Sequence, residues 1–215
     1  MKITIFSESS FDETALKILI EGILGEEIEE VFRLNQLKSR GFSSVLTETP
    51  IVIRAAYYQN METEAVVIVC DSDDEPVHNT THEEDGNEEA QRCRLCSLKR
   101  IVDETLAALK PLPHRPMLKI AIGVAVPAIE AWYLCGINPH VNEATWIRKQ
   151  NGEKIQYDRK SLKVELYGND RPAIETLREK AIESAERLVE DLEQLEGFFP
   201  QGFGCLANEI RGWKE

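Results

Sequence analysis

The sequence contains no apolar run that approaches the length of a membrane span. Its first ten residues, MKITIFSESS, become acidic too soon to form the apolar region of a secretory leader. The five cysteines are an odd number at irregular spacings, so they do not make a disulfide framework and suit a reducing compartment. These absences predict a cytoplasmic protein without a membrane partner.

Positive charge is also scarce, with 25 Lys and Arg residues against 38 Asp and Glu residues and a formal net charge of -13. Such a chain gains little from counterion release, so a broad polyanion-binding surface is not expected. An activity on nucleic acid is not excluded, because divalent cations bound at a carboxylate cluster reverse the sign of the local electrostatic field. The glycine-rich loops that cradle nucleotide phosphates are missing, so no bound nucleotide is implied.

Apolar patterns predict strands that alternate with helices. Strands are expected at residues 2–6, 28–34, 64–71 and 117–126, and helices at residues 11–25, 49–60, 88–110, 127–136, 172–196 and 203–213. Pro50 is placed in the first turn of its helix, and a strand is the competing interpretation of residues 49–60. Residues 74–88 are read as a loop, and residues 137–160 show no clear pattern.

This alternation predicts an α/β fold with a mostly parallel sheet flanked by helices. The unbroken apolar run in EAVVIVCD (64–71) is typical of a strand that is buried on both faces of such a sheet. Residues 1–136 are expected to form the α/β domain. Residues 137–215 are expected to form a C-terminal helical extension that packs on this domain as a cap, within one structural unit.

Acidic residues follow three of the predicted strands, where ligands bind in open parallel sheets. Glu8 lies just beyond the first strand, Asp71 ends the third, and Glu130 lies one short helical turn past the fourth. Residues two apart in an extended segment point to the same side, so Asp71 and Asp73 are expected to converge on one cation, with Asp74 in reserve. Carboxylate oxygens with water are the ligands that Mg²⁺ and Mn²⁺ prefer.

Each of these acids also has a purely structural interpretation. An Asp-x-Asp after a buried strand is often a polar turn, and Glu8 is a suitable acid for a helix N-terminus beside Ser9, Ser10 and Asp12. Glu130 can be a polar residue whose hydrogen bonds are satisfied, on a helix that otherwise serves packing. A functional site is favoured because all these acids fall at strand carboxyl ends of one predicted sheet.

Five short motifs carry a family resemblance. They are ESSFD (8–12), DSD (71–73), IEAWYLCG (129–136), KSLKVELYG (160–168) and FGCLANEIR (203–211). Their order resembles the Toprim domain, and in particular stand-alone bacterial Toprim-like proteins of uncharacterised function that are related to the OLD-family nucleases. The resemblance covers most of the chain and implies a Toprim-like, Rossmann-like fold.

The resemblance also implies roles for the acids. Asp71 and Asp73 would bind a divalent metal, and Glu8 would be a metal ligand or a general acid/base. Ser9 stands where the family usually has glycine, a residue that lets the backbone approach a phosphate closely.

Further along the chain, Glu130 would be an additional acid at the same site, and Lys163 or Lys160 would contact phosphate. The implied activity is a Mg²⁺- or Mn²⁺-dependent nuclease, or a related phosphodiester phosphoryl-transfer enzyme, that acts on nucleic acid in phage or mobile-element defence. The alternative is a non-catalytic Toprim-like module that binds a partner protein such as a separately encoded ATPase. A homo-oligomer is compatible with both.

Two basic stretches are candidates for substrate contacts. They are residues 92–100 and 146–160, and Trp146 and Tyr157 make the second the better candidate for contacts with a nucleic-acid backbone. An ordinary solvated loop is the alternative interpretation of this second stretch.

A second metal site is indicated by His78 and His82 followed by Cys93 and Cys96. Both the H-x3-H and the C-x2-C halves have the spacing of structural zinc ligands. Against zinc, both cysteines fall inside the predicted helix 88–110, where cysteine often packs as a small apolar residue. The histidines also lie in an acidic loop where they can simply be solvated.

Overall fold

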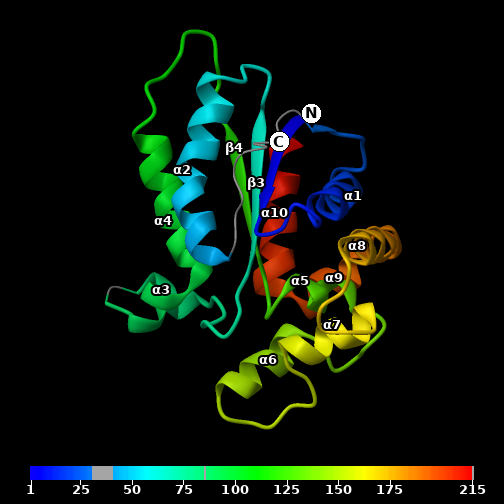
Figure 1. Cartoon of the computed structure of the whole chain (residues 1–215). Coiled ribbons are helices and arrows are strands. Elements are labelled where there is room, and N and C mark those ends of the chain that lie inside the picture. The colour runs from blue at the N-terminus through cyan, green and yellow to red at the C-terminus, as the bar shows by residue number, and fades with distance from the viewer. Residues whose placement is uncertain (31–40, 85, 215) are drawn as a thin grey trace.

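The structure, a computed structural model, describes residues 1–30, 41–84 and 86–214. Its centre is a four-stranded parallel sheet with the strand order β2-β1-β3-β4 (Figure 1). In chain order the strands are β1 (Lys2–Ser7), β2 (Glu29–Glu30), β3 (Ala65–Asp71) and β4 (Lys119–Ala125). Residues 31–34 of the predicted strand 28–34 lie outside the described residues.

Strand β3 is buried on both faces, because β1 and β4 pair with its two edges and helices cover both sides of the sheet. Val67 and Val69 belong to one hydrophobic core, whereas Val66 and Ile68 belong to the core on the opposite face. Successive strand residues alternate between faces. A strand between two cores therefore needs an unbroken apolar run, as the sequence predicted.

Helices cover each face of the sheet. The described α-helices are α1 (Glu13–Leu24), α2 (Phe42–Tyr58), α3 (Glu88–Arg92), α4 (Arg94–Ala107), α5 (Ile129–Tyr133), α6 (Glu143–Gln150), α7 (Arg159–Tyr167), α8 (Ile174–Leu188), α9 (Leu192–Phe198) and α10 (Cys205–Arg211). Helices α2 and α4 pack side by side on one face, whereas α1 and α10 cover the other and α8 packs against α1 (Figure 1). The predicted α/β fold with a parallel sheet and a C-terminal helical segment is confirmed.

Two long predicted helices are interrupted. Cys93 has an extended backbone (φ -61°, ψ 122°), which divides the predicted helix 88–110 into α3 and α4. The predicted helix 172–196 ends at Leu188 in the structure, and a new helix, α9, follows. The Asp191 side chain caps α9 by accepting a hydrogen bond from the Gln194 N–H at 3.0 Å, which allows the chain to change direction there.

Other helices differ from prediction in their position. Helix α2 begins at Phe42, so Pro50 lies in its interior and the prediction of Pro50 in the first turn was wrong. The predicted loop 74–88 contains a short 3-10 turn at Thr80–Glu83. The unpatterned residues 137–160 contain α6 and the start of α7, two helices that are short and capped by side chains at their N-termini. None of the described helices combines the length and apolarity needed to cross a membrane.

The C-terminal segment is tied to the sheet by a π-helical turn at Pro200–Gly204. The Glu143 carboxylate is only 1% exposed and accepts hydrogen bonds from the Gly202 N–H at 2.6 Å and the Gln201 N–H at 2.9 Å. Burial raises the pKa of Glu143 to about 7. A Cβ on Gly202 would lie 2.3 Å from the Val124 carbonyl oxygen, so only glycine fits there.

The division of the chain at residue 136, into an α/β domain and a helical cap, stays a prediction.

Candidate functional site

A cleft with a volume of about 280 Å³ lies at the carboxyl ends of β1 and β3, next to α5. Because the strands run parallel, the segments that follow them gather at this one edge, beyond which α5 and α7 lie (Figure 1). Its charged lining consists of Glu8, Asp12, Asp71, Glu130, Arg159 and Lys163. The structure therefore brings four sequence-predicted site residues together: Glu8, Asp71, Glu130 and Lys163.

A hydrogen bond from the main chain of Asp71 to the side chain of Glu8 links these two residues. Glu8 follows the last residue of β1, and its Oε1 accepts a hydrogen bond from the Asp71 N–H at 3.1 Å. Asp71 is the last residue of β3, and its Oδ1 accepts from the Ile129 N–H at 2.9 Å, at the start of α5. Each carboxylate thus accepts a main-chain N–H, so both are held in place by the sheet edge and by the start of α5.

Asp12 and Glu130 enter the cleft from two different helices. Asp12 immediately precedes α1, and its Oδ1 accepts a hydrogen bond from the Tyr133 hydroxyl at 2.9 Å. Glu130 lies in the first turn of α5 and is 5% exposed. Its Oε1 lies 3.7 Å from Lys163 Nζ, whereas its buried Oε2 has no hydrogen-bond partner among the described residues. A buried carboxylate oxygen without a partner is costly, and it marks a place where a ligand can bind.

Crowding in the cleft favours the protonated form of its acids. Burial raises the pKa of Asp71 well above its ordinary value, and the negative charges of Glu130, Glu8 and Asp12 raise it further. Burial, followed by the charge of Glu130, raises the pKa of Asp12 to about 7. Burial also raises the pKa values of Glu8 and Glu130. The cleft therefore holds several acids whose negative charges disfavour one another.

Arg94, at the start of α4, contacts the cleft acids from the other side of the sheet edge. Its guanidinium lies over the Phe42 ring, 4.6 Å from the centroid, and donates to the Asp71 carbonyl oxygen at 2.7 Å. It also lies 3.4 Å from Glu8 Oε1 and pairs with the Asp73 carboxylate. The sequence placed Arg94 only within a basic stretch for substrate contacts. Nothing in that pattern indicated that it pairs with the acids of its own chain.

Asp73 and Asp74 lie apart from the cleft lining. Strand β3 ends at Asp71, and Asp73 has a φ of 53° in the following turn, so the extended geometry expected for residues 71–73 does not continue past Asp71. The Asp73 carboxylate pairs with Arg94 and, at 2.6 Å, with Arg159. The exposed Asp74 carboxylate lies 3.5 Å from Lys149 Nζ.

The second basic stretch is mostly structural. Trp146 and Tyr157 are buried and stack on each other with ring centroids 5.9 Å apart, so neither ring is free to stack on a nucleic-acid base. Lys160 is exposed and pairs with Asp170 at 3.1 Å, outside the cleft lining. Of this stretch, only Arg159, the first residue of α7, lines the cleft as a cation, and Lys163 lines it from one turn further along α7.

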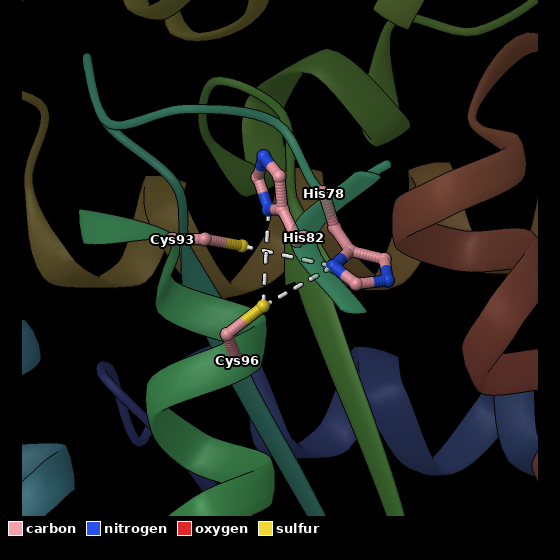
Figure 2. Close-up of side chains that lie close together, drawn as sticks. All are labelled: His78, His82, Cys93 and Cys96. Carbon is pink, nitrogen blue, oxygen red and sulfur yellow. Dashed lines mark hydrogen bonds between the residues drawn. The ribbon is translucent and has the colours of Figure 1, made fainter. Parts of the chain in front are cut away.

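A second cluster lies near the cleft and is formed by His78, His82, Cys93 and Cys96 (Figure 2). Their ligand atoms all lie within 4.8 Å of one another, so the cluster could bind a metal ion such as zinc. In the described part of the chain it is the one group of this kind, and the cleft carboxylates do not form such a tight set.

Comparisons with protein-family models, with curated proteins and with solved structures find no match to this chain. The family resemblance drawn from the motifs stays a prediction.

Proposed function

We propose that the chain is a divalent-cation-dependent enzyme that hydrolyses phosphodiester bonds of nucleic acid, as the Toprim-like motifs imply. The observation that carries the proposal is the meeting of Glu8, Asp71 and Glu130 with Lys163 in one cleft at the carboxyl edge of the sheet. Clefts at this edge are where open α/β sheets bind their ligands. Carboxylates can bind a metal cation, and a neighbouring lysine can bind a phosphate next to that cation.

Glu8, Asp71 and Glu130 are the residues that would hold Mg²⁺ or Mn²⁺. Glu130 offers a buried oxygen without a hydrogen-bond partner among the described residues. Burial, and after it the charges of Glu130, Glu8 and Asp12, raises the pKa of Asp71, and a cation would relieve that repulsion. When bound, the ion supplies Lewis-acid activation of the phosphoryl group and of the attacking water.

The basic side chains that line the cleft bind the substrate phosphate in this proposal. Lys163 Nζ, 3.7 Å from Glu130, and the Arg159 guanidinium line the cleft with the acids and provide charge for the non-bridging phosphate oxygens. Glu8 serves as the base that takes the proton from the attacking water, because it lines the cleft at the end of β1 and burial raises its pKa. The water oxygen bonds to phosphorus as the ester P–O bond breaks, and the leaving oxygen takes up a proton from solvent, so that one phosphate end and one hydroxyl end result.

Asp73 has a positioning role in the proposal. It pairs with Arg94 and Arg159 together, and these arginines approach the cleft from α4 and α7. Asp73 therefore holds the arginines that frame the cleft. Asp74 is exposed and has no role in the reaction.

The test is a cleavage assay on plasmid, linear duplex and single-stranded DNA and on RNA, with Mg²⁺ and then with Mn²⁺. We expect cation-dependent cleavage that Glu8→Gln or Asp71→Asn lowers about 100-fold or more. The matched control is Asp74→Asn, an exposed acid close in sequence, which should leave the rate unchanged. Cleavage that survives both cleft substitutions would contradict the proposed site.

A non-catalytic module that binds a partner protein is favoured by one observation, the pairing of Asp73 with two arginines that neutralise an expected metal ligand. An absence of cleavage on every substrate, together with an absence of cation binding, would support this second candidate.

A further inference from the structure

The cluster of His78, His82, Cys93 and Cys96 joins two separate segments of the chain. The histidines come from the segment that follows β3, and the cysteines come from the junction of α3 and α4 (Figure 2). The side chains point toward a common centre. The described cysteines are all free thiols, so both sulfur atoms are available as ligands.

Three of the distances between the ligand atoms lie close to the edges of a tetrahedral zinc site. Bonds of about 2.3 Å to sulfur and 2.0–2.1 Å to nitrogen imply ligand separations of about 3.4–3.8 Å. In the structure, Cys96 Sγ lies 3.3 Å from His78 Nδ1 and 3.8 Å from His82 Nδ1, and Cys93 Sγ lies 3.9 Å from His78 Nδ1. All four ligand atoms lie within 4.8 Å of one another, as ligands of one shared metal ion must.

We propose that these four side chains hold one structural zinc ion, which ties the segment after β3 to the start of α4 and thereby positions Arg94. Two cysteines and two histidines complete a tetrahedral shell with no position left for substrate, which is the mark of a structural site. The proposal does not depend on the proposed function, because it concerns a separate cluster with its own readouts.

The surroundings of His82 agree with a metal ligand. Its side chain is fully buried, and its Nε2 lies 3.2 Å from Asn79 Nδ2 and 3.7 Å from a Glu89 carboxylate oxygen. When Nδ1 binds the metal, Nε2 carries the proton, and its acceptor would be the Glu89 carboxylate, because the Asn79 Nδ2 group is itself a donor. Glu89 lies in α3, next to the two cysteines.

The ion would act on the cleft through Arg94. This residue directly follows the ligand Cys93, and its guanidinium reaches Glu8, Asp73 and the carbonyl of Asp71. Fixing Cys93 and Cys96 fixes the first turn of α4, from which Arg94 extends. Fixing His78 also limits the freedom of the turn that carries Asp73.

The first experiment measures zinc by mass spectrometry in protein purified without a histidine tag. We expect one zinc ion per chain in the wild type and in the control Cys205→Ser, which alters a half-buried thiol elsewhere. Cys96→Ser should lose the ion. Less than about a tenth of a zinc ion per wild-type chain after growth with added zinc would overturn the proposal.

A second experiment on the wild type avoids the risk that a variant fails to fold. Exchange of zinc for Co²⁺ should produce the intense visible bands of a tetrahedral site together with thiolate charge-transfer absorption. A weak octahedral spectrum would overturn the site. Removal of the ion should also accelerate hydrogen exchange at residues 71–78 and 93–97 but not in the core of β3, and unchanged exchange at these residues would overturn the positioning of Arg94.

Discussion

Replacing Asp12 with asparagine should stabilise the protein, because Asp12 lies in a crowded acidic cleft. Its Oδ1 accepts the Tyr133 hydroxyl at 2.9 Å, and the asparagine carbonyl oxygen can keep that hydrogen bond. The substitution removes a charge whose cost from burial and from Glu130 outweighs the attraction of Lys163 and the hydrogen bonds of Tyr133 and Ser9. A gain in stability on removal of a side-chain charge would be direct evidence that the cleft holds more negative charge than the fold alone prefers.

The size of the gain follows from the pKa of Asp12, which rises from 3.8 to about 7 on folding. A shift of about three units corresponds to about 4 kcal/mol. The folded state binds more protons than the unfolded state between these two values, so wild-type stability falls as the pH rises from about 4 to about 7. Asparagine does not titrate, so the advantage of Asp12→Asn should grow across this window and be largest above pH 7.

The assay is urea unfolding of both proteins between pH 5 and pH 8 in buffer without divalent cations. The stability difference should more than double from about pH 5 to about pH 8. Adding Mg²⁺ at pH 8 should reduce the difference, because a bound cation stabilises the wild-type carboxylates. A variant that is less stable than the wild type at pH 8, or a stability difference that does not change with pH, would show that Asp12 does not carry an unfavourable charge in the folded protein.

Two further substitutions test other parts of the structure. Arg94→Gln leaves Asp73 and Glu8 without a buried cationic partner and should cost about 3 kcal/mol or more of unfolding free energy, measured by urea unfolding. An effect within a few tenths of a kcal/mol would show that the pairing is not formed. Gly202→Ala forces a methyl group against the Val124 carbonyl oxygen and should cost about 1–3 kcal/mol, read as a lower melting temperature. An unchanged melting temperature would contradict the close approach of these segments.

The sequence was sufficient to predict the sheet and the edge at which the candidate site lies. The apolar run of β3 reports burial on both faces, and Glu8 and Asp71 follow strands whose ends must meet in a parallel sheet. Glu130 was placed correctly at this edge because the strand before it and the short helix that carries it were both recognisable.

The remaining features depend on contacts that a local pattern does not contain. Asp73 was expected to share a face with Asp71, but the strand ends and the chain turns with a positive φ at Asp73. The pairing of Arg94 with Glu8 links residues far apart in the chain. The break at Cys93 falls inside a sequence pattern that is typical of a continuous helix. The His-Cys cluster joins segments that are apart in the sequence, and local helix propensity does not include such tertiary contacts.

The measurement that tests the central claim most directly is calorimetric titration of Mn²⁺ into zinc-loaded wild-type protein and into Asp71→Asn. Zinc loading keeps the His-Cys cluster from contributing to the signal. We expect a Mn²⁺ site in the wild type that Asp71→Asn weakens strongly and that the control Asp74→Asn leaves intact. Equal binding by wild type and Asp71→Asn, or no binding by the wild type, would contradict it.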